Sequence, residues 1–185
     1  MQSLIIKQTD KLPEPWFSDL QRSVFDDLQA PGFAFNPVVS SEAMGRAGLT
    51  TSGTVTHAPI ARFVAYDGDE LVGWSFGWME RGDTFYMANS GVISSHRRRG
   101  VYSKLMTHVV EYARSHRAVE VHSQHCVVNN PVIIAKLRFG FQISGLSLNA
   151  QMGTLVELKH HIYDARSKVF RDRAIPFAVS PNVSG

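Results

Sequence analysis

Cysteine is almost absent from this chain, and so are the segments that anchor or export proteins. Cys126 is the only cysteine, which excludes an intramolecular disulfide and a cysteine-rich zinc site. Unbroken apolar stretches such as residues 131–135 are too short to span a bilayer. Residues 1–7 lack a basic segment followed by a long apolar core, so we expect no secretory signal and a cytoplasmic location. No run of like charge exceeds residues 96–99, and no repeat of solenoid length is present.

What the chain does contain is enough apolar sequence for one compact domain. Its 185 residues are 44% apolar and 19% charged, which fits a single buried core and leaves little room for a second. We therefore expect one domain over residues 1–173 and a loose, Pro/Ser/Gly-rich tail at 174–185. The net charge of +3 and the isoelectric point near 9.2 suit a phosphate-bearing ligand, but they are too weak to indicate nucleic acid.

Apolar periodicity and turn residues predict the order of strands and helices. Strands are predicted at 4–7, 60–66, 71–78, 84–93, 119–122, 141–146 and 154–158. Helices are predicted at 16–28, 102–113 and 130–139, the last with Asn130 as its N-cap and Gly140 as its end. Residues 33–58 carry no regular signal. An antiparallel meander that leads into a strand–helix–strand unit predicts a mixed sheet of the α+β class.

The junction between the strand that ends near Ile93 and the following helix has the features of an anion site. Residues 96–99, His-Arg-Arg-Arg, form a basic turn, and Gly100 opens the helix. The first N–H groups of a helix lack internal partners and carry the positive end of its dipole, and glycine lets a phosphate approach the backbone. The Walker and dinucleotide-binding glycine patterns are absent. Such a turn is also common as a solvated helix cap, so it does not establish a site by itself.

The junction resembles the acetyl-CoA pyrophosphate loop of the GNAT family of N-acetyltransferases, written Arg/Gln-x-x-Gly-x-Gly/Ala. Arg97-Arg98-Arg99-Gly100-Val101-Tyr102 supplies the first four positions, and Tyr102 stands where a small residue is usual. Residues 129–141 resemble the family's later Asn…Ala…Tyr…Leu-Gly-Phe pattern, whose asparagine matches Asn129 by spacing or Asn130 by helix capping. The resemblance covers residues 60–160 and implies the family's fold, a central, mostly antiparallel sheet flanked by helices.

The resemblance also implies that acetyl-CoA is the co-substrate and that an amine of a small molecule or peptide attacks it directly in a ternary complex. The pyrophosphate would lie on the turn and the first helical residues, Arg97, Arg98, Arg99, Gly100, Val101, Tyr102 and Ser103. Val92 and Ile93 would offer backbone groups to the pantetheine arm, and Asn129 or Asn130 would complete the site. We expect no metal ion, nucleic acid or membrane as a partner, and a monomer or homodimer.

Three side chains are candidates for proton transfer in such a reaction. Counted from Asn129, Lys136 occupies the position where many family members carry a tyrosine that protonates the thiolate. Lys136 either takes that role or, as we favour at this point, is a surface residue while another group serves. Glu80 is the carboxylate nearest to the position, near Tyr86, where histone-type relatives carry a glutamate base. Tyr102, at the start of the cofactor helix, is the third candidate.

The histidines and the cysteine receive no catalytic role. His122 and His125 are three residues apart in extended chain and do not share a face, so they do not predict a metal site. We expect His160 and His161 at the surface of a strand end, and Cys126 as a small buried apolar residue.

Two other functions remain as alternatives to an acetyltransferase. The absence of the usual tyrosine and glutamate favours a non-catalytic acyl-CoA-binding module. A nucleic-acid-binding domain that uses residues 96–99 is weaker, because no aromatic residues interleave with the arginines. The segments expected to shape the acceptor pocket, 33–58 and 146–153, carry no recognisable signature of the acceptor.

Overall fold

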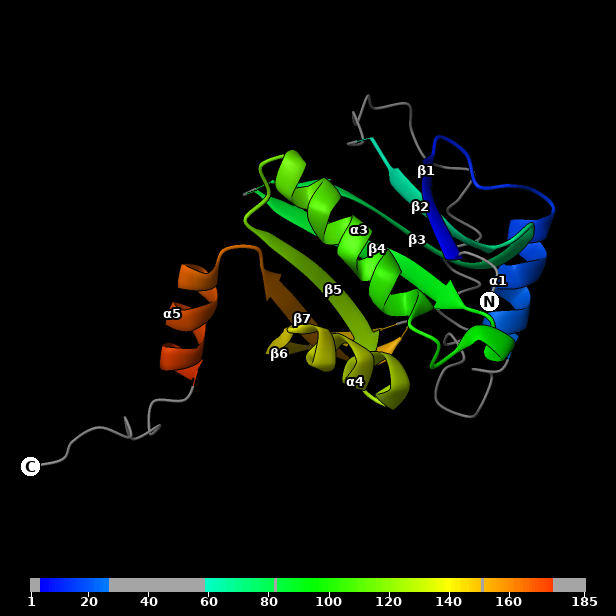
Figure 1. Ribbon diagram of the computed structural model, residues 1–185. Helices are drawn as coiled ribbons and strands as arrows, with labels where there is room; N and C mark the ends of the chain where they lie inside the picture. The colour runs from blue at the N-terminus through cyan, green and yellow to red at the C-terminus, as the bar shows by residue number, and fades with distance from the viewer. Residues whose placement is uncertain (1–3, 27–58, 82, 151, 175–185) are drawn as a thin grey trace, which may run out of the picture.

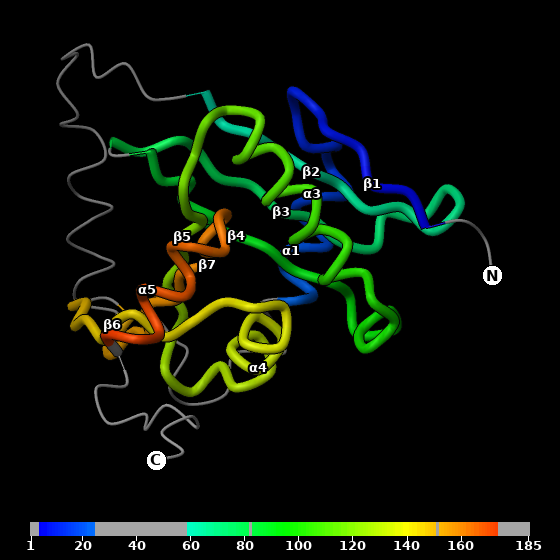
Figure 2. Tube along the Cα trace, turned by 60° about the vertical axis from the view of Figure 1, so that its left-hand side comes forward, coloured from blue at the N-terminus to red at the C-terminus, as the bar shows by residue number. Residues whose placement is uncertain are grey.

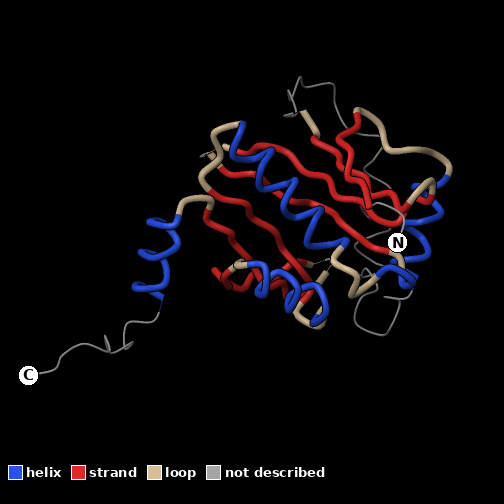
Figure 3. The backbone as a smooth tube through the Cα atoms, viewed as in Figure 1, coloured by secondary structure: helices blue, strands red, loops and turns tan. Residues whose placement is uncertain are grey.

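A seven-stranded sheet with helices outside it makes up the part of the chain that the computed structural model describes, residues 4–26, 59–81, 83–150 and 152–174 (Figures 1 and 3). The strands are β1 (Leu4–Thr9), β2 (Ala61–Asp67), β3 (Glu70–Glu80), β4 (Thr84–Val92), β5 (Glu120–Cys126), β6 (Gln142–Asn149) and β7 (Gly153–His161). The helices are α1 (Trp16–Asp26), α3 (Val101–Ser115), α4 (Asn130–Phe139) and α5 (Asp164–Ala174), with a 3-10 turn at Ser94–His96. The predicted irregular segment at 33–58 and residues 175–185 of the predicted tail lie outside the described residues.

The sheet is mixed, with the strand order β1-β2-β3-β4-β5-β7-β6 and its edge strands β1 and β6 at opposite sides of the molecule (Figure 2). Neighbouring strands pair antiparallel except β4 and β5, which are parallel and are joined by α3. A parallel pair needs such a crossover connection, since a tight turn can join only antiparallel strands. The predicted α+β architecture, mostly antiparallel and flanked by helices, is confirmed.

The parallel pair β4–β5 is short, and the two strands then separate. They pair only from Thr84 with Glu120 to Tyr86 with His122, and their far ends point apart in Figure 1. Ala88 is an extra residue in β4, because Phe76 pairs with Asn89 while the next residue of β3 pairs with Met87. A bulge of this kind bends its strand and increases the local twist. The sheet therefore opens between β4 and β5 from about Met87 onward.

Helix α3 covers one face of the sheet because its apolar residues recur at helical spacing. Leu105, Met106, Val109 and Ala113 are almost fully buried, and they join Phe85 and other strand residues in the main core. Helix α1 packs on the other face, where Phe17 meets Trp74 edge to face with 5.4 Å between the ring centroids. The sheet thus has helices on both faces, and strand alternation decides which side chains lie on each face.

Helix α5 was not predicted, and β5 and β7 extend further than predicted. Only a few apolar residues occur in α5, although its charges suit a helix, with Asp164 in the first turn and Arg171 and Arg173 in the last. The later parts of β5 and β7 carry His, Ser, Gln and Lys, which interrupt the apolar pattern. In the described part of the chain, no helix is both long enough and apolar enough to cross a membrane.

Candidate functional site

The predicted anion site lies at the start of α3, beside the end of β4. Gly100 is the N-cap of α3 and has a φ of 81°, a left-handed conformation that glycine adopts readily. A Cβ placed on Gly100 would meet no atom within 4 Å, so the space in front of the helix is open. The first N–H groups of α3 face that space without partners inside the helix. Val101 is buried and holds this end of the helix on the sheet, while Ser103 is exposed.

The turn before α3 is fastened to the β2–β3 hairpin through Asp67. The Oδ2 atom of Asp67 lies 3.3 Å from Nε2 of the buried His96 and 3.5 Å from Nη2 of Arg99. Arg98 is exposed and has a φ of 64°, which is uncommon for a residue with a side chain. These contacts hold the turn in one conformation, so that the N–H groups that follow it are preorganised for an anion.

Val92 and Ile93, which were predicted to face the pantetheine arm, direct their backbone groups to opposite edges of β4. Ile93 donates its N–H to the carbonyl of Val72 at 3.1 Å and accepts the N–H of His96 at 3.0 Å. Successive residues of a strand direct their backbone groups to opposite edges, so those of Val92 point away from β3 and toward the gap. Arg97 Nε donates to the carbonyl of Val92 at 3.2 Å. The structure thus orients Val92 toward the gap, but not the N–H of Ile93.

Lys136 is the side chain that reaches the place where β4 and β5 separate. It extends from α4 and is completely buried, with an exposed fraction of 0%. Its Nζ donates to Ser123 Oγ on β5 at 2.7 Å and lies 3.2 Å from Met87 Sδ on β4. The Phe141 ring is 4.6 Å from the same nitrogen, within the range of a cation–π contact. The interpretation of Lys136 as a surface residue was therefore wrong.

The surroundings of Lys136 disfavour its positive charge. Among the residues that the structure describes, no carboxylate pairs with it, and burial lowers the pKa of its amine to about 7. Ser123 is also completely buried, and its Oγ lies 3.2 Å from Nε2 of His125. Burial and the nearby Lys136 lower the pKa of His125 to about 3, so this ring is neutral and does not compete for the proton. An amine that titrates near neutral pH lies between the two strands.

Tyr102 lies in the first turn of α3 and is tied to β4. Its hydroxyl is 3.1 Å from Oγ of Ser90, and burial raises the pKa of the phenol to about 12. The hydroxyl is therefore protonated at neutral pH and is a weak acid.

Glu80 is distant from both of the other catalytic candidates. It is exposed at the end of β3 and pairs with Thr84 at the start of β4. Ser90, the partner of Tyr102, lies six positions after Thr84, which is about 20 Å of extended chain. The structure does not bring Glu80 and Tyr102 together, and it places Lys136 near the middle of β4.

Helix α4 begins one residue earlier than helix-capping rules predicted. Asn129 is the N-cap, Asn130 is the first helical residue, and neither is fixed by a side-chain capping bond. The prediction of Asn130 as the N-cap was wrong, because proline is accommodated here one position further into the helix. The N-cap is instead the residue selected by family spacing.

Sequence reasoning missed the partners of Lys136 and the unpaired Nε2 atom of His122. Met87 and Ser123 are far apart in the chain, and only the register of β4 and β5 brings them together. On the opposite face of β5, the Nε2 atom of His122 is buried and has no hydrogen-bond partner. No pattern of residue types signals such an atom, since the cross-strand neighbours of His122, Tyr86 and Lys159, come from distant parts of the chain.

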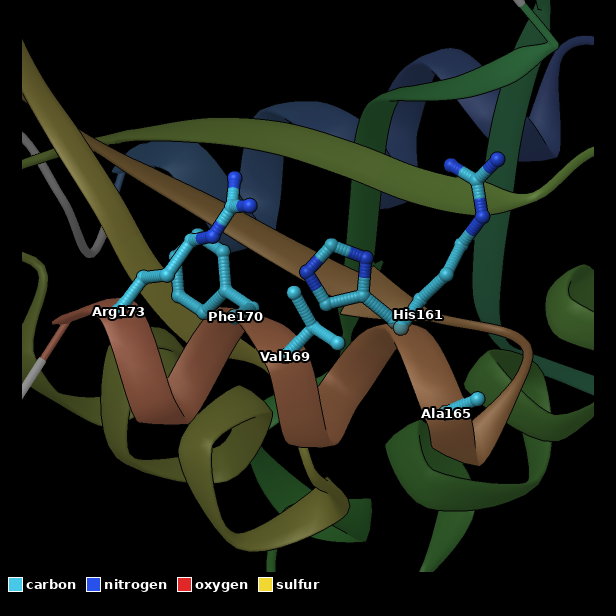
Figure 4. A pocket seen from close by; sticks show the side chains of 6 residues that line it. His161, Ala165, Val169, Phe170 and Arg173 are labelled. Atoms are coloured by element: carbon cyan, nitrogen blue, oxygen red, sulfur yellow. The ribbon is translucent and has the colours of Figure 1, made fainter.

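A separate open hollow of about 380 Å³ lies beneath α5 (Figure 4). His161, Val169 and Phe170 extend into it, and the His161 and Phe170 rings are 5.1 Å apart. The side chain of His161 is 8% exposed, so the expectation of a surface residue was wrong for this histidine, which packs beneath an unpredicted helix. None of the predicted cofactor or catalytic residues lines this hollow. Cys126 is buried, as expected.

Comparison with known proteins identifies the relatives of this fold and sequence. The sequence profile of the acetyltransferase (GNAT) family matches residues 10–141. Among solved structures, nourseothricin acetyltransferase is 26% identical, with a TM-score of 0.53 over 56% of this chain and 66% of that one. A Bacillus subtilis acetyltransferase in complex with CoA is 17% identical, with a TM-score of 0.58 over 86% of this chain and 99% of that one. Ard1 from Thermoplasma volcanium is 14% identical, with a TM-score of 0.60 over 85% and 98%.

These findings test the resemblance that the two sequence segments indicated. No curated protein matches the chain, so the family assignment depends on the profile and the fold. The profile covers most of the described sheet and both α3 and α4, and the solved structures share the fold. The predicted family, fold and class of enzyme are confirmed: the chain belongs to the GNAT family of acetyltransferases.

Proposed function

We propose that this protein transfers an acetyl group from acetyl-CoA to an amine by direct attack, and that Lys136 protonates the departing thiolate. The observation that carries the proposal is the buried amine of Lys136 between β4 and β5, bonded to Ser123 and paired with no carboxylate among the described residues. A buried ionisable group without a counter-ion destabilises a fold. Its presence at the opening of the sheet supports a catalytic role.

The pKa of Lys136 fits proton transfer to a thiolate. Proton donors work best when their pKa lies near the working pH, and burial lowers this one to about 7. A lysine with an ordinary pKa would hold its proton more tightly. The contact between Nζ and Ser123 Oγ orients the amine within the opening. Lys136 therefore takes the place of the tyrosine that the family resemblance led us to expect.

Acetyl-CoA as the acetyl donor is supported by the start of α3 and by the CoA-bound relative from Bacillus subtilis. The pyrophosphate would lie on the N–H groups of residues 98–103, where the space in front of Gly100 is open. Arg98 and the partly exposed Arg99 would add positive charge. The pantetheine arm would then follow β4 toward Lys136, along the edge to which Val92 directs its backbone groups.

The test is release of CoA thiol from acetyl-CoA with a panel of primary amines. Lys136→Met keeps an apolar side chain of similar length and should lower kcat about 100-fold, with little change in the Kd for CoA. Lys168→Met, the same change at an exposed position on α5, is the control and should retain full activity. If Lys136→Met retains the wild-type kcat, Lys136 is not the proton donor. If the protein binds CoA tightly but releases no thiol from acetyl-CoA with any of the amines, the non-catalytic binding module is favoured instead.

A further inference from the structure

The face of the sheet opposite α3 carries a row of polar and aromatic side chains beside the opening. Tyr86, His122 and Lys159 are paired across β4, β5 and β7, so that their side chains share this face. Gln124 Nε2 donates to Glu157 Oε1 at 3.1 Å in the next pair along. The adjacent residues on the other face, such as Val121, are buried in the main core. This row is distinct from the core and lies where the strands separate.

His122 is the unsatisfied member of this row. Its Nε2 atom is buried without a hydrogen-bond partner, and its ring centroid is 5.6 Å from that of Tyr86. A buried polar atom left unpaired costs about 1–3 kcal/mol, so a hydrogen bond from a ligand to Nε2 would be favourable. Burial lowers the pKa of His122, which keeps the ring neutral at pH 7 and able to accept a proton. The atom is therefore available to a ligand that donates a hydrogen bond.

His122 and Lys136 approach the opening from opposite faces of the sheet. His122 is the last residue of β5 that pairs with β4, and the next residue, Ser123, bonds to Lys136 on the other face. A thioester in the opening would direct its sulfur toward Lys136. Its carbonyl carbon would then be open to a nucleophile from the face of His122. Deprotonation of the acceptor and protonation of the thiolate would then take place on opposite faces of the sheet.

The charges around His122 favour a cation. Those that face it are Glu80 from β3, Tyr86 from β4, Glu120 from β5, and Glu157 and Lys159 from β7. Lys159 is already bonded to Glu120, with 2.7 Å between Nζ and Oε1. No cation pairs with Glu157 among the residues that the structure describes. The remaining negative charge attracts an ammonium group and stabilises an imidazolium once it forms.

We propose that His122 removes the proton from the acceptor, and that the acceptor is a primary alkylamine that arrives as an ammonium ion. This inference depends on the acetyl transfer proposed above. Nε2 of His122 takes one proton from the ammonium, and the neutral nitrogen attacks the thioester carbonyl. The C–N bond forms, the C–S bond breaks, and the thiolate takes a proton from Lys136. A second proton leaves the amide nitrogen to water, after which water reprotonates Lys136 and accepts the proton of His122.

The experiment compares His122→Gln with wild type on a pair of amines that differ mainly in basicity. The pair is propylamine and 2,2-difluoropropylamine, whose amine is less protonated at the assay pH because fluorine withdraws electrons from it. With the alkylamine, His122→Gln should lower kcat/KM about 100-fold, and with the difluoro analogue the loss should be under about tenfold. His108→Gln, the same change on α3, should behave as wild type. With the alkylamine, the wild-type kcat/KM should level off above the pKa of His122, whereas that of His122→Gln should keep rising with pH, because only the neutral amine then reacts.

The outcomes separate this inference from the proposed function. Wild-type turnover of an alkylamine with equal rates for His122→Gln would overturn the inference and leave acetyl transfer intact. Equal losses with both members of the pair would also overturn it, because His122 would then be structural. Turnover of aromatic amines alone would refute the alkylamine as acceptor. If no amine releases thiol, the proposed function fails as well.

Discussion

Replacing Lys136 by methionine should stabilise the protein while lowering its kcat about 100-fold. The pKa of this amine is about 7 in the folded state and 10.5 in an unfolded chain. Because the unfolded state holds more protons between these values, the stability of the wild type rises with pH across that window. At pH 7 the penalty is about 4 kcal/mol, since lowering a pKa by one pH unit costs about 1.4 kcal/mol.

The hydrogen bond to Ser123 offsets part of this gain. Its loss costs about 1 kcal/mol, since Ser123 keeps His125 as a neighbour. The net gain for Lys136→Met is then about 3 kcal/mol at pH 7, which raises Tm by about 9 °C in a chain of this length. At pH 9 the wild type has regained about 2 kcal/mol, so the difference should shrink to about 1 kcal/mol.

Differential scanning calorimetry and urea unfolding at pH 7 and pH 9 measure these differences. The control is Lys168→Met, which is exposed and should leave Tm within about 1 °C of the wild type at both pH values. A variant that is less stable than the wild type at pH 7 would refute the reasoning. So would a difference that is the same at the two pH values, because Lys136 would then have an ordinary pKa.

Two further predictions concern the cofactor loop and the partner of Lys136. Gly100→Glu should abolish CoA binding in a calorimetric titration, because it adds bulk and negative charge where the pyrophosphate would lie. Gly153→Glu, at another glycine with positive φ and open surroundings, is its control, and normal CoA binding by Gly100→Glu would place the loop elsewhere. Ser123→Ala removes an acceptor from the ammonium of Lys136, which should lower the pKa of Lys136 and move the alkaline limb of the kcat profile to lower pH. An unchanged limb would show that Lys136 does not control it.

The start of α3 could be predicted from the sequence because its signals are local. A basic turn, a glycine and an amphipathic helix lie within about twenty residues, and each acts on its neighbours in the chain. The structure adds the contact between Asp67 and His96, which fastens the turn from a distant hairpin. Since that contact joins residues 29 positions apart, no local pattern indicates it.

The residues of the proposed acceptor side could not be predicted, because they belong to four strands. His122 has the sequence pattern of an ordinary strand residue, and only the strand pairing brings it beside Tyr86 and Lys159. Helix α5 was missed for a related reason. Its few apolar residues pack on the end of β7, so its contacts are not visible in its own periodicity.

The sequence by itself determined the family resemblance, the order of the elements as far as β7, and the position of Lys136 seven residues after Asn129. It left open whether that lysine is buried, and on local evidence the surface was favoured. Only the tertiary structure decided this question, because the bulge at Ala88 bends β4 where it leaves β5, and Lys136 reaches from α4 to Met87 and Ser123 on these two strands. Burial is a property of all the elements around a side chain, and with burial came the lowered pKa on which the proposed chemistry depends.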